Sequence, residues 1–213
     1  MDLKVLYQLT YGLYIVGAFK GGRPVGCVIN TCFQVTSENP LLVISVNKDN
    51  YTLEAIRENR RFSLSIVAEE TQPEIIGKFG FFTGRDTDKY ADFGFEVHSH
   101  VPCVNGIFAG RLILEAEQCT DCGTHVLVLA RLIDTIEGSG TPMTYAYYHR
   151  VIKGKAPKNA PTYQAESKPA DSRNIRRYEC QVCHYIAEVE DELPEDYTCP
   201  VCGVDRSFFK EIV

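Results

Sequence analysis

Short runs of apolar residues, several alternating with polar ones, fill most of the chain before residue 140 and predict a mostly β structure. The predicted strands are Thr10–Phe19, Arg23–Asn30, Leu41–Asn47, Phe62–Ala68, Gly106–Glu117 and His125–Ile136. The segment Gly21–Pro24 predicts a hairpin turn. Short helices are predicted at Thr52–Asn59, with Thr52 as N-cap, and at Glu74–Phe79. Many closely spaced strands with few helices indicate a β-barrel decorated by helices.

This pattern breaks at Ala156–Asn174, a stretch with three prolines and almost no large aliphatic residues. Such a composition predicts a linker or an extended arm. A flexible chain of this length has a root-mean-square span of roughly 25 Å, so it permits a small following domain to move, or to dock on a neighbouring subunit. We therefore expect three parts: a barrel at 1–155, a linker at 156–174 and a small domain at 175–213.

Charge and composition narrow the possible functions. The chain has 213 residues and a net charge of -6, which argues against a nucleic-acid partner. It has neither an apolar run of eighteen residues nor a signal peptide, so we expect a cytoplasmic protein without a membrane partner. Nine cysteines in such a compartment indicate metal or redox chemistry rather than a disulfide framework.

Four of these cysteines form two CxxC pairs near the C-terminus: Cys180 with Cys183, and Cys199 with Cys202. Two tight turns of this kind, facing each other, predict a tetrahedral S4 metal cage. The spacing also fits a structural zinc ribbon, but the surroundings favour iron. This segment is acidic, and its many rings would hold solvent off a redox centre: Tyr178, Tyr185, Tyr197, Phe208 and Phe209.

Residues 176–213 resemble rubredoxin. The match rests on Tyr178-x-Cys-x-x-Cys, Tyr185, Leu193-Pro194 and Tyr197-Thr-Cys-Pro-x-Cys-Gly. The gap between the pairs is shorter than in free-standing rubredoxins and closer to the rubredoxin-like domain of rubrerythrins. His184 stands where the family usually has glycine, so we expect strain or a shifted reduction potential there, whereas Gly203 keeps the glycine role in the second pair. The resemblance implies one Fe(Cys)4 centre that passes single electrons and binds no substrate.

A phosphate site is predicted where the strand Leu41–Asn47 runs into the helix expected at Thr52. The start of a helix offers free amides and the positive end of its dipole, Lys48 adds charge, and Asn50 and Thr52 add hydrogen-bond donors. The alternative is that Thr52 is only an N-cap and Lys48 only a surface charge. A Rossmann site is not indicated, because the chain has no GxGxxG motif.

Residues 1–155 and the start of the arm resemble the flavin-reductase-like family of FMN-binding split barrels. The motifs are Cys27–Thr36, Pro40–Val46 followed by Lys48 to Thr52, Thr83–Lys89, Tyr147–Arg150 and Lys153–Tyr163.

That resemblance implies FMN at a homodimer interface, and it implies roles for nine residues. Asn30, Thr31 and Cys32 would line the isoalloxazine; Asn47, Lys48, Asn50 and Thr52 would hold the phosphate; Lys89 is a further phosphate candidate, and His149 would lie near the nicotinamide. Thr31 and Cys32 have an alternative as buried strand residues.

Other polar and thiol groups have simpler interpretations. Cys119 and Cys122 form a CxxC pair between two predicted strands, which favours two hairpin thiols over a regulatory disulfide or a metal site. Cys27 and Cys103 are expected to be structural. His98 and His100 are expected at the surface, because two histidines without a third ligand are a poor metal site.

As a whole, the chain resembles the flavin reductase–rubredoxin fusions called high-molecular-weight rubredoxins. The resemblance implies that NAD(P)H reduces FMN, and that the iron centre relays electrons to a protein acceptor, a flavodiiron protein that reduces nitric oxide or dioxygen. The protein positions the cofactors, and no side chain is required as a general acid or nucleophile. Two alternatives stay open: a free flavin reductase with a structural zinc knuckle, and a non-catalytic FMN-binding scaffold.

Overall fold

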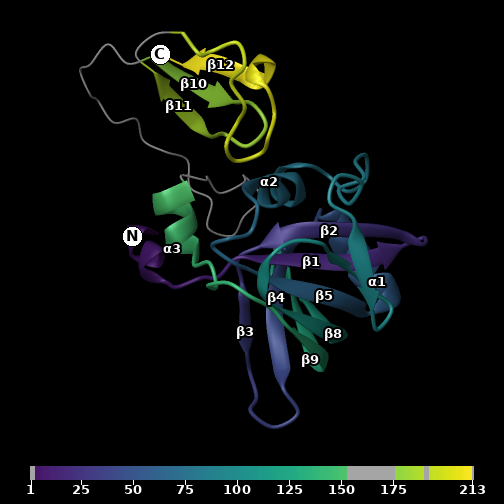
Figure 1. The fold of residues 1–213 in the computed structure, drawn as a ribbon. Helices are drawn as coiled ribbons and strands as arrows, with labels where there is room; N and C mark the ends of the chain where they lie inside the picture. Colours follow the sequence, from purple (N-terminus) through teal and green to yellow (C-terminus); the bar gives the residue numbers. More distant parts are fainter. Residues whose placement is uncertain (1–2, 153–175, 190–191, 213) are drawn as a thin grey trace.

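The computed structural model describes residues 3–152, 176–189 and 192–212. It is mainly β, as predicted, with a larger barrel and a small C-terminal sheet (Figure 1). The exact domain boundaries stay a prediction, and the expected linker at 156–174 lies outside the described residues.

The barrel is one antiparallel seven-stranded sheet in the order β2-β1-β5-β8-β9-β4-β3. Its strands are β1 (Tyr14–Lys20), β2 (Arg23–Ile29), β3 (Cys32–Gln34), β4 (Leu41–Asn47), β5 (Arg61–Val67), β8 (Phe108–Asp121) and β9 (His125–Glu137). The inward face of these strands forms the main apolar core, which includes Val16, Ile44, Phe62, Leu64 and Val128. The alternating burial of β4 shows how a period of two fills such a core from one face.

All six predicted strands are present: β4 has the predicted bounds, and the other five have shifted ends. The turn at Gly21–Pro24 is confirmed: Lys20 pairs with Arg23, and Gly21 and Gly22 take φ values of 56° and 78°. A two-residue turn with both central residues at positive φ matches the twist of a hairpin, and glycine adopts that backbone without strain. The first strand begins at Tyr14 instead of Thr10, because Gly12 pairs with Thr144 in an isolated bridge outside the sheet.

Two helices cover parts of the barrel. Helix α1 (Tyr51–Asn59) buries Leu53, Ala55 and Ile56 in the main core. Its N-cap is Asn50, whose side chain accepts a hydrogen bond from the Thr52 amide at 2.9 Å, so the prediction that Thr52 caps this helix was wrong. Helix α2 (Pro73–Phe81) begins with proline at its first position and packs Ile75, Ile76 and Phe79 against the barrel.

Several short elements were not predicted. They are the 3-10 helix η1 (Leu3–Gln8), the hairpin of β6 (Phe95–His98) and β7 (Val101–Val104), and the helical turns α3 (Tyr145–Tyr147) and η2 (Tyr148–Ile152). Among the described residues, no helix has the length and apolar character required to span a bilayer.

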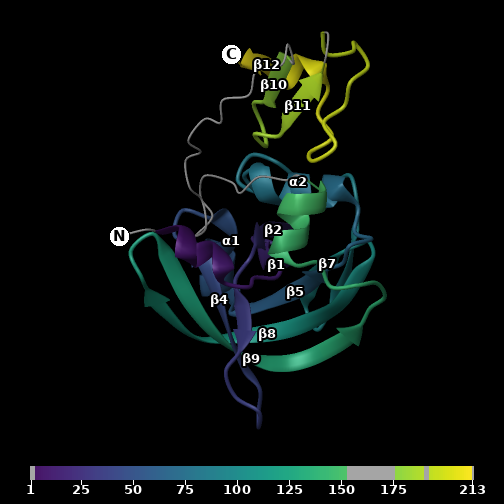
Figure 2. The ribbon, with the colours of Figure 1, turned by 90° about the vertical axis from the view of Figure 1, so that its left-hand side faces the viewer.

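The C-terminal part is a three-stranded antiparallel sheet in the order β11-β10-β12. Its strands are β10 (Arg176–Cys180), β11 (Ile186–Val189) and β12 (Phe209–Ile212), with a short helical turn η3 (Arg206–Phe208) before β12. Both views place this sheet above α2, on the far side of that helix from the barrel (Figures 1 and 2).

Candidate functional site

Four buried thiols meet at the edge of the C-terminal sheet. The ligand atoms of Cys180, Cys183, Cys199 and Cys202 all lie within 4.8 Å of one another. The Sγ atoms of Cys180 and Cys202 are 3.6 Å apart, and those of Cys183 and Cys199 are 3.4 Å apart. A metal at about 2.3 Å from four tetrahedral sulfurs requires separations of about 3.8 Å, so the arrangement fits an M(Cys)4 ion with no open position. An all-sulfur tetrahedral donor set suits iron or zinc.

The two cysteine turns repeat the same backbone bonds. The amides of Cys180 and Cys199 donate to the carbonyls five residues later, at 2.9 Å to Tyr185 and 2.8 Å to Val204. The amides of His184 and Gly203 donate back to Cys180 and Cys199 at 2.8 and 2.9 Å.

The closing position of each turn is left-handed, with φ of 60° at His184 and 72° at Gly203. The predicted strain at His184 therefore has a structural basis, since a non-glycine residue occupies a glycine conformation. The His184 Nδ1 atom also lies 2.8 Å from Glu179 Oε1.

The expected shell of rings is largely present. Tyr178, Tyr185, Tyr197 and Phe209 pack around the thiol cluster and the sheet beside it, with Tyr197 and Phe209 in edge contact at 5.3 Å. Phe208 is 45% exposed, so its predicted place in this shell was wrong. The thiols interact closely: hydrogen bonds from Cys183, Cys199 and Cys202 lower the pKa of Cys180, and hydrogen bonds with Cys180 raise the pKa values of Cys183 and Cys202, so the four thiols titrate as one unit.

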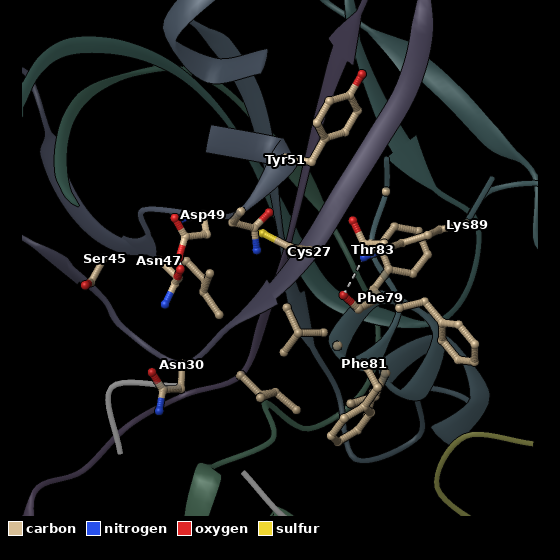
Figure 3. A pocket seen from close by; sticks show the side chains of 18 of the residues that line it. Cys27, Asn30, Ser45, Asn47, Asp49, Tyr51, Phe79, Phe81, Thr83 and Lys89 are labelled. Atoms are coloured by element: carbon tan, nitrogen blue, oxygen red, sulfur yellow. Dashed lines mark hydrogen bonds between the residues drawn. The ribbon is translucent and has the colours of Figure 1, made fainter. Parts of the chain in front are cut away.

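A cavity of about 420 Å³ opens on the barrel between α1, α2 and the turns of α3 and η2. Polar side chains lie mainly on one wall, and Phe79, Phe81 and Lys89 lie opposite (Figure 3). The volume and the mixture of aromatic and polar groups are typical of a cofactor site. Of the predicted cofactor residues, Asn30, Asn47, Asn50 and Lys89 line this cavity.

Four other predicted cofactor residues lie outside the cavity lining. Lys48 has a partly exposed side chain outside the cavity lining. Its Nζ lies 2.6 Å from Oδ2 of Asp121, the last residue of β8. Thr52 is buried in the first turn of α1. Thr31 is partly buried, and Cys32 packs against the main core, where burial raises the pKa of its thiol to about 12. Their cofactor roles stay predictions. His149 contacts the Tyr145 ring at 4.3 Å and does not line the cavity.

Lys89 is a buried cation in the cavity wall. It is 3% exposed, and its Nζ donates to the carbonyls of Gly26 and Phe79, both at 2.9 Å. Burial lowers the pKa of Lys89 to about 8, while the nearby Cys27 opposes that shift. The ammonium thereby ties the end of α2 to β2 along one side of the cavity.

Sequence reasoning missed the aromatic lining and the cations around it. Tyr51 lines the cavity, and the charged groups of Lys20, Arg23 and Arg85 lie 5.3, 5.9 and 4.7 Å from its ring centre. These cations come from a hairpin and a loop, so no linear motif joins them. Tyr148 belongs to the motif Tyr147–Arg150 but had no predicted role, and Tyr145 was not predicted at all, yet both line the cavity.

The thiol cluster and the cavity share a wall. Val182 and His184, on either side of Cys183, are among the residues that line the cavity. From the other side, Phe81 at the end of α2 lines the cavity and packs against the thiol cluster. Burial raises the pKa of Tyr148, and the nearby thiol of Cys183 adds to that shift.

The remaining candidates show no second site. Cys119 and Cys122 are free, exposed thiols at the β8–β9 turn, as the hairpin interpretation predicted. Cys27 and Cys103 are buried, as expected. His100 is exposed, and His98 pairs with Glu96 at 3.0 Å. Within the described residues, only the four C-terminal cysteines form a group able to hold a metal ion.

Comparison with known proteins gives two family matches. Residues 6–155 match the flavin reductase like domain, and residues 178–210 match the rubredoxin-like domain of rubrerythrin. The chain is 37% identical to the high molecular weight rubredoxin of Moorella thermoacetica, with both chains covered completely. It is 34% identical to the NAD(P)H ferric-chelate reductase of Archaeoglobus fulgidus, over 76% of this chain and 98% of that protein.

Solved structures resemble the barrel. The FMN-binding protein from Thermus thermophilus superposes with a TM-score of 0.57 at 24% identity, covering 62% of this chain and 74% of that one. This likeness shows the shared fold.

Proposed function

The chain belongs to the flavin reductase-like domain family and carries a rubredoxin-like domain, and from that premise we propose that it passes electrons from NAD(P)H through FMN to an iron tetrathiolate. The observation that carries the proposal is the shared wall between the cavity and the thiol cluster. A flavin reductase without a redox partner has no need to seat an all-sulfur metal site beside its cofactor.

The cavity residues have separate tasks in this proposal. FMN supplies a two-electron acceptor that releases electrons one at a time. Asn30 and Asn47, on one wall, present amide groups suited to the polar edge of the flavin and its ribityl chain (Figure 3). Asn50 and Tyr51 place the start of α1 at the cavity, where backbone amides and the helix dipole favour a phosphate. Phe79, Phe81 and Tyr148 exclude water from the redox edge.

Lys89 and the cations near Tyr51 provide the positive charge that the phosphate requires. Lys89 lines the cavity, and Arg23 and Arg85 lie over the ring of Tyr51, which also lines it; Arg85 pairs with Glu54 at 2.7 Å. Lys48 stays a weaker candidate because it lies outside the cavity lining and pairs with Asp121. Thr31, Cys32, Thr52 and His149 would act only after side-chain movement.

Iron is the proposed metal because the thiols sit in a ring-lined shell beside a cavity for a redox cofactor. Electrons would leave through a protein acceptor, and a flavodiiron protein is our specific proposal. We further propose a cytoplasmic homodimer. Phe33 and Val35, 56% and 50% exposed on the β3–β4 hairpin that extends from the barrel (Figure 1), offer an apolar surface to a second copy.

An anaerobic titration with NADH tests this function. We expect the absorption of bound flavin and that of the ferric thiolate centre to bleach together, with a high-spin ferric EPR signal before NADH is added. Cys180→Ser should remove the iron bands and leave flavin reduction intact. Stoichiometric zinc without the EPR signal would instead favour a free flavin reductase with a structural knuckle, and absent flavin reduction would leave only a binding scaffold.

A further inference from the structure

We propose that α2 is a built-in docking site for the second cysteine turn, and that Gly77 is the positioning residue that allows the tetrathiolate to reach the flavin cavity of its own chain. The inference rests on the proposed function and adds the route: transfer within one docked chain, in place of a freely swinging or exchanged domain. It gives one face of α2 a role in docking, which the folding of the barrel alone does not require.

Helix α2 has two buried faces. Ile75, Ile76 and Phe79 pack on the barrel. A second face of α2 carries residues 74, 77 and 81, because their spacing of three and four residues places them on the same side of a helix. That second face meets the C-terminal domain through Glu74, Gly77 and Phe81.

Gly77 is the point of closest approach. A Cβ atom at this position would overlap the Val201 carbonyl oxygen and the Cys202 Cα, and it would lie 2.9 Å from the Cys202 Cβ. Glycine in a helix interior costs about 1 kcal/mol relative to alanine, so its presence here needs a reason. The space taken by the backbone of the cysteine turn provides one.

Contacts on both sides of Gly77 continue this interface. One helical turn earlier, Glu74 Cγ would be 3.5 Å from a Cβ added at Gly203, an ordinary packing distance. One turn later, Phe81 packs against the thiol cluster and lines the cavity. Val182 and His184 complete the same wall from the first cysteine turn. Docking through Gly77 therefore positions the thiol cluster directly beside the cavity.

The step that this arrangement serves is a one-electron transfer. One electron would leave the reduced flavin and reduce the ferric ion to the ferrous ion, and no bond to the metal would form or break. Two such transfers, each followed by delivery to an acceptor, would return the flavin to its oxidised form, and the proton that remains after hydride transfer would leave to solvent. The rate of each transfer depends on the fraction of molecules in the docked arrangement.

Gly77→Ala is the test. The added methyl group must displace backbone atoms, while alanine strengthens α2 itself, so the barrel stays folded and the small domain lifts off. After rapid anaerobic mixing with NADH, we expect flavin reduction at the wild-type rate and iron reduction slowed about tenfold, because the docked fraction falls. Gly110→Ala in β8 is the matched control, since a Cβ there meets only ordinary contacts at 3.5 and 3.9 Å.

A structural measurement tests the docked arrangement without relying on electron transfer. In the wild type, amide exchange in α2 should be slow, and NMR relaxation should show residues 176–189 tumbling with the barrel. Gly77→Ala should raise the mobility of the small domain, and Gly110→Ala should not. Wild-type iron reduction with unchanged tumbling in Gly77→Ala would overturn the inference, although the proposed function would stand. Loss of flavin reduction by NADH in the wild type would instead overturn the function.

Discussion

At the scale of single residues, the two cysteine turns share one backbone conformation but differ in the residue that adopts it. His184 and Gly203 occupy equivalent positions with φ near 60° and 72°, and each donates its amide to the first cysteine of its pair. Glycine tolerates this conformation, whereas a side chain does not. The sequence alone predicted the position of this strain, because the motif aligned His184 with a glycine.

We predict that Gly203→Ala destabilises the metal site by about 1–2 kcal/mol, because the left-handed region is costly for any residue with a Cβ. The new methyl group itself has room, with Glu74 Cγ at 3.5 Å, so the backbone is the cause. Release of metal to a chelator should therefore be faster in this variant. His184→Gly is the reciprocal variant and should slow release; equal rates in all three proteins would contradict this explanation.

Lys89 predicts a specific pH dependence of stability. Its pKa in the folded protein is about 8, below its ordinary value of 10.5, so between these values the unfolded chain binds more protons than the folded one. The free energy of unfolding should then rise with pH across this window, by up to about 3 kcal/mol. Below pH 8 both states carry the proton, and Lys89 contributes no slope.

Urea denaturation from pH 7.5 to 10.5, compared between the wild type and Lys89→Met, checks this prediction over roughly that window. The difference between the two profiles isolates Lys89 from other groups that titrate there. Lys78→Met is the control, because Lys78 pairs with Asp92 at 2.8 Å on the surface and should keep the wild-type slope. Parallel profiles for the wild type and Lys89→Met would refute the assignment.

At the scale of elements, the strands were predictable where side chains alternate over a long run. Strand β4 (Leu41–Asn47) has the predicted bounds because every second residue enters the core. The three-residue β3 and the four-residue β6 and β7 were missed, since such runs are too short for a period of two to be distinguished. The turns around Tyr145 and Tyr148 were missed because their aromatic residues pack on the cavity without a regular helical pattern.

Substitutions of Asn50, at the start of helix α1, test the candidate phosphate site. Asn50→Ala removes the side chain that accepts a hydrogen bond from the Thr52 amide. This loss should lower the free energy of unfolding by about 1 kcal/mol. Asn50→Ser should recover most of that stability, because serine is an equally good N-cap. If the Asn50 amide also contacts the flavin phosphate, serine will restore stability but not the flavin Kd, measured by fluorescence quenching. Equal Kd values in all three proteins would remove Asn50 from the phosphate site.

At the scale of the whole molecule, charge is divided unevenly. Residues 176–213 contain nine acidic and four basic residues, a net charge of -5 out of -6 for the whole chain. The face of this domain that meets α2 is formed by Val201, Cys202 and Gly203, whereas Glu188, Glu195 and Asp196 are exposed elsewhere on the domain. The sequence revealed the charge but not its separation from the docking face, because that separation depends on how the domain packs.

This division predicts different salt responses for the two proposed electron-transfer steps. In the proposed route, transfer from flavin to iron would cross a packed wall, so its rate should be nearly independent of ionic strength. Delivery to a cationic acceptor depends on long-range attraction between surface charges, which salt screens beyond about 10 Å at 0.1 M. With cytochrome c as a cationic probe, its reduction should slow as salt is raised. Replacing Glu195 and Asp196 by lysine should slow it further at low salt, and Glu38→Lys on the barrel should have little effect. If iron reduction within the chain showed the stronger salt dependence, the packed wall could not be its route.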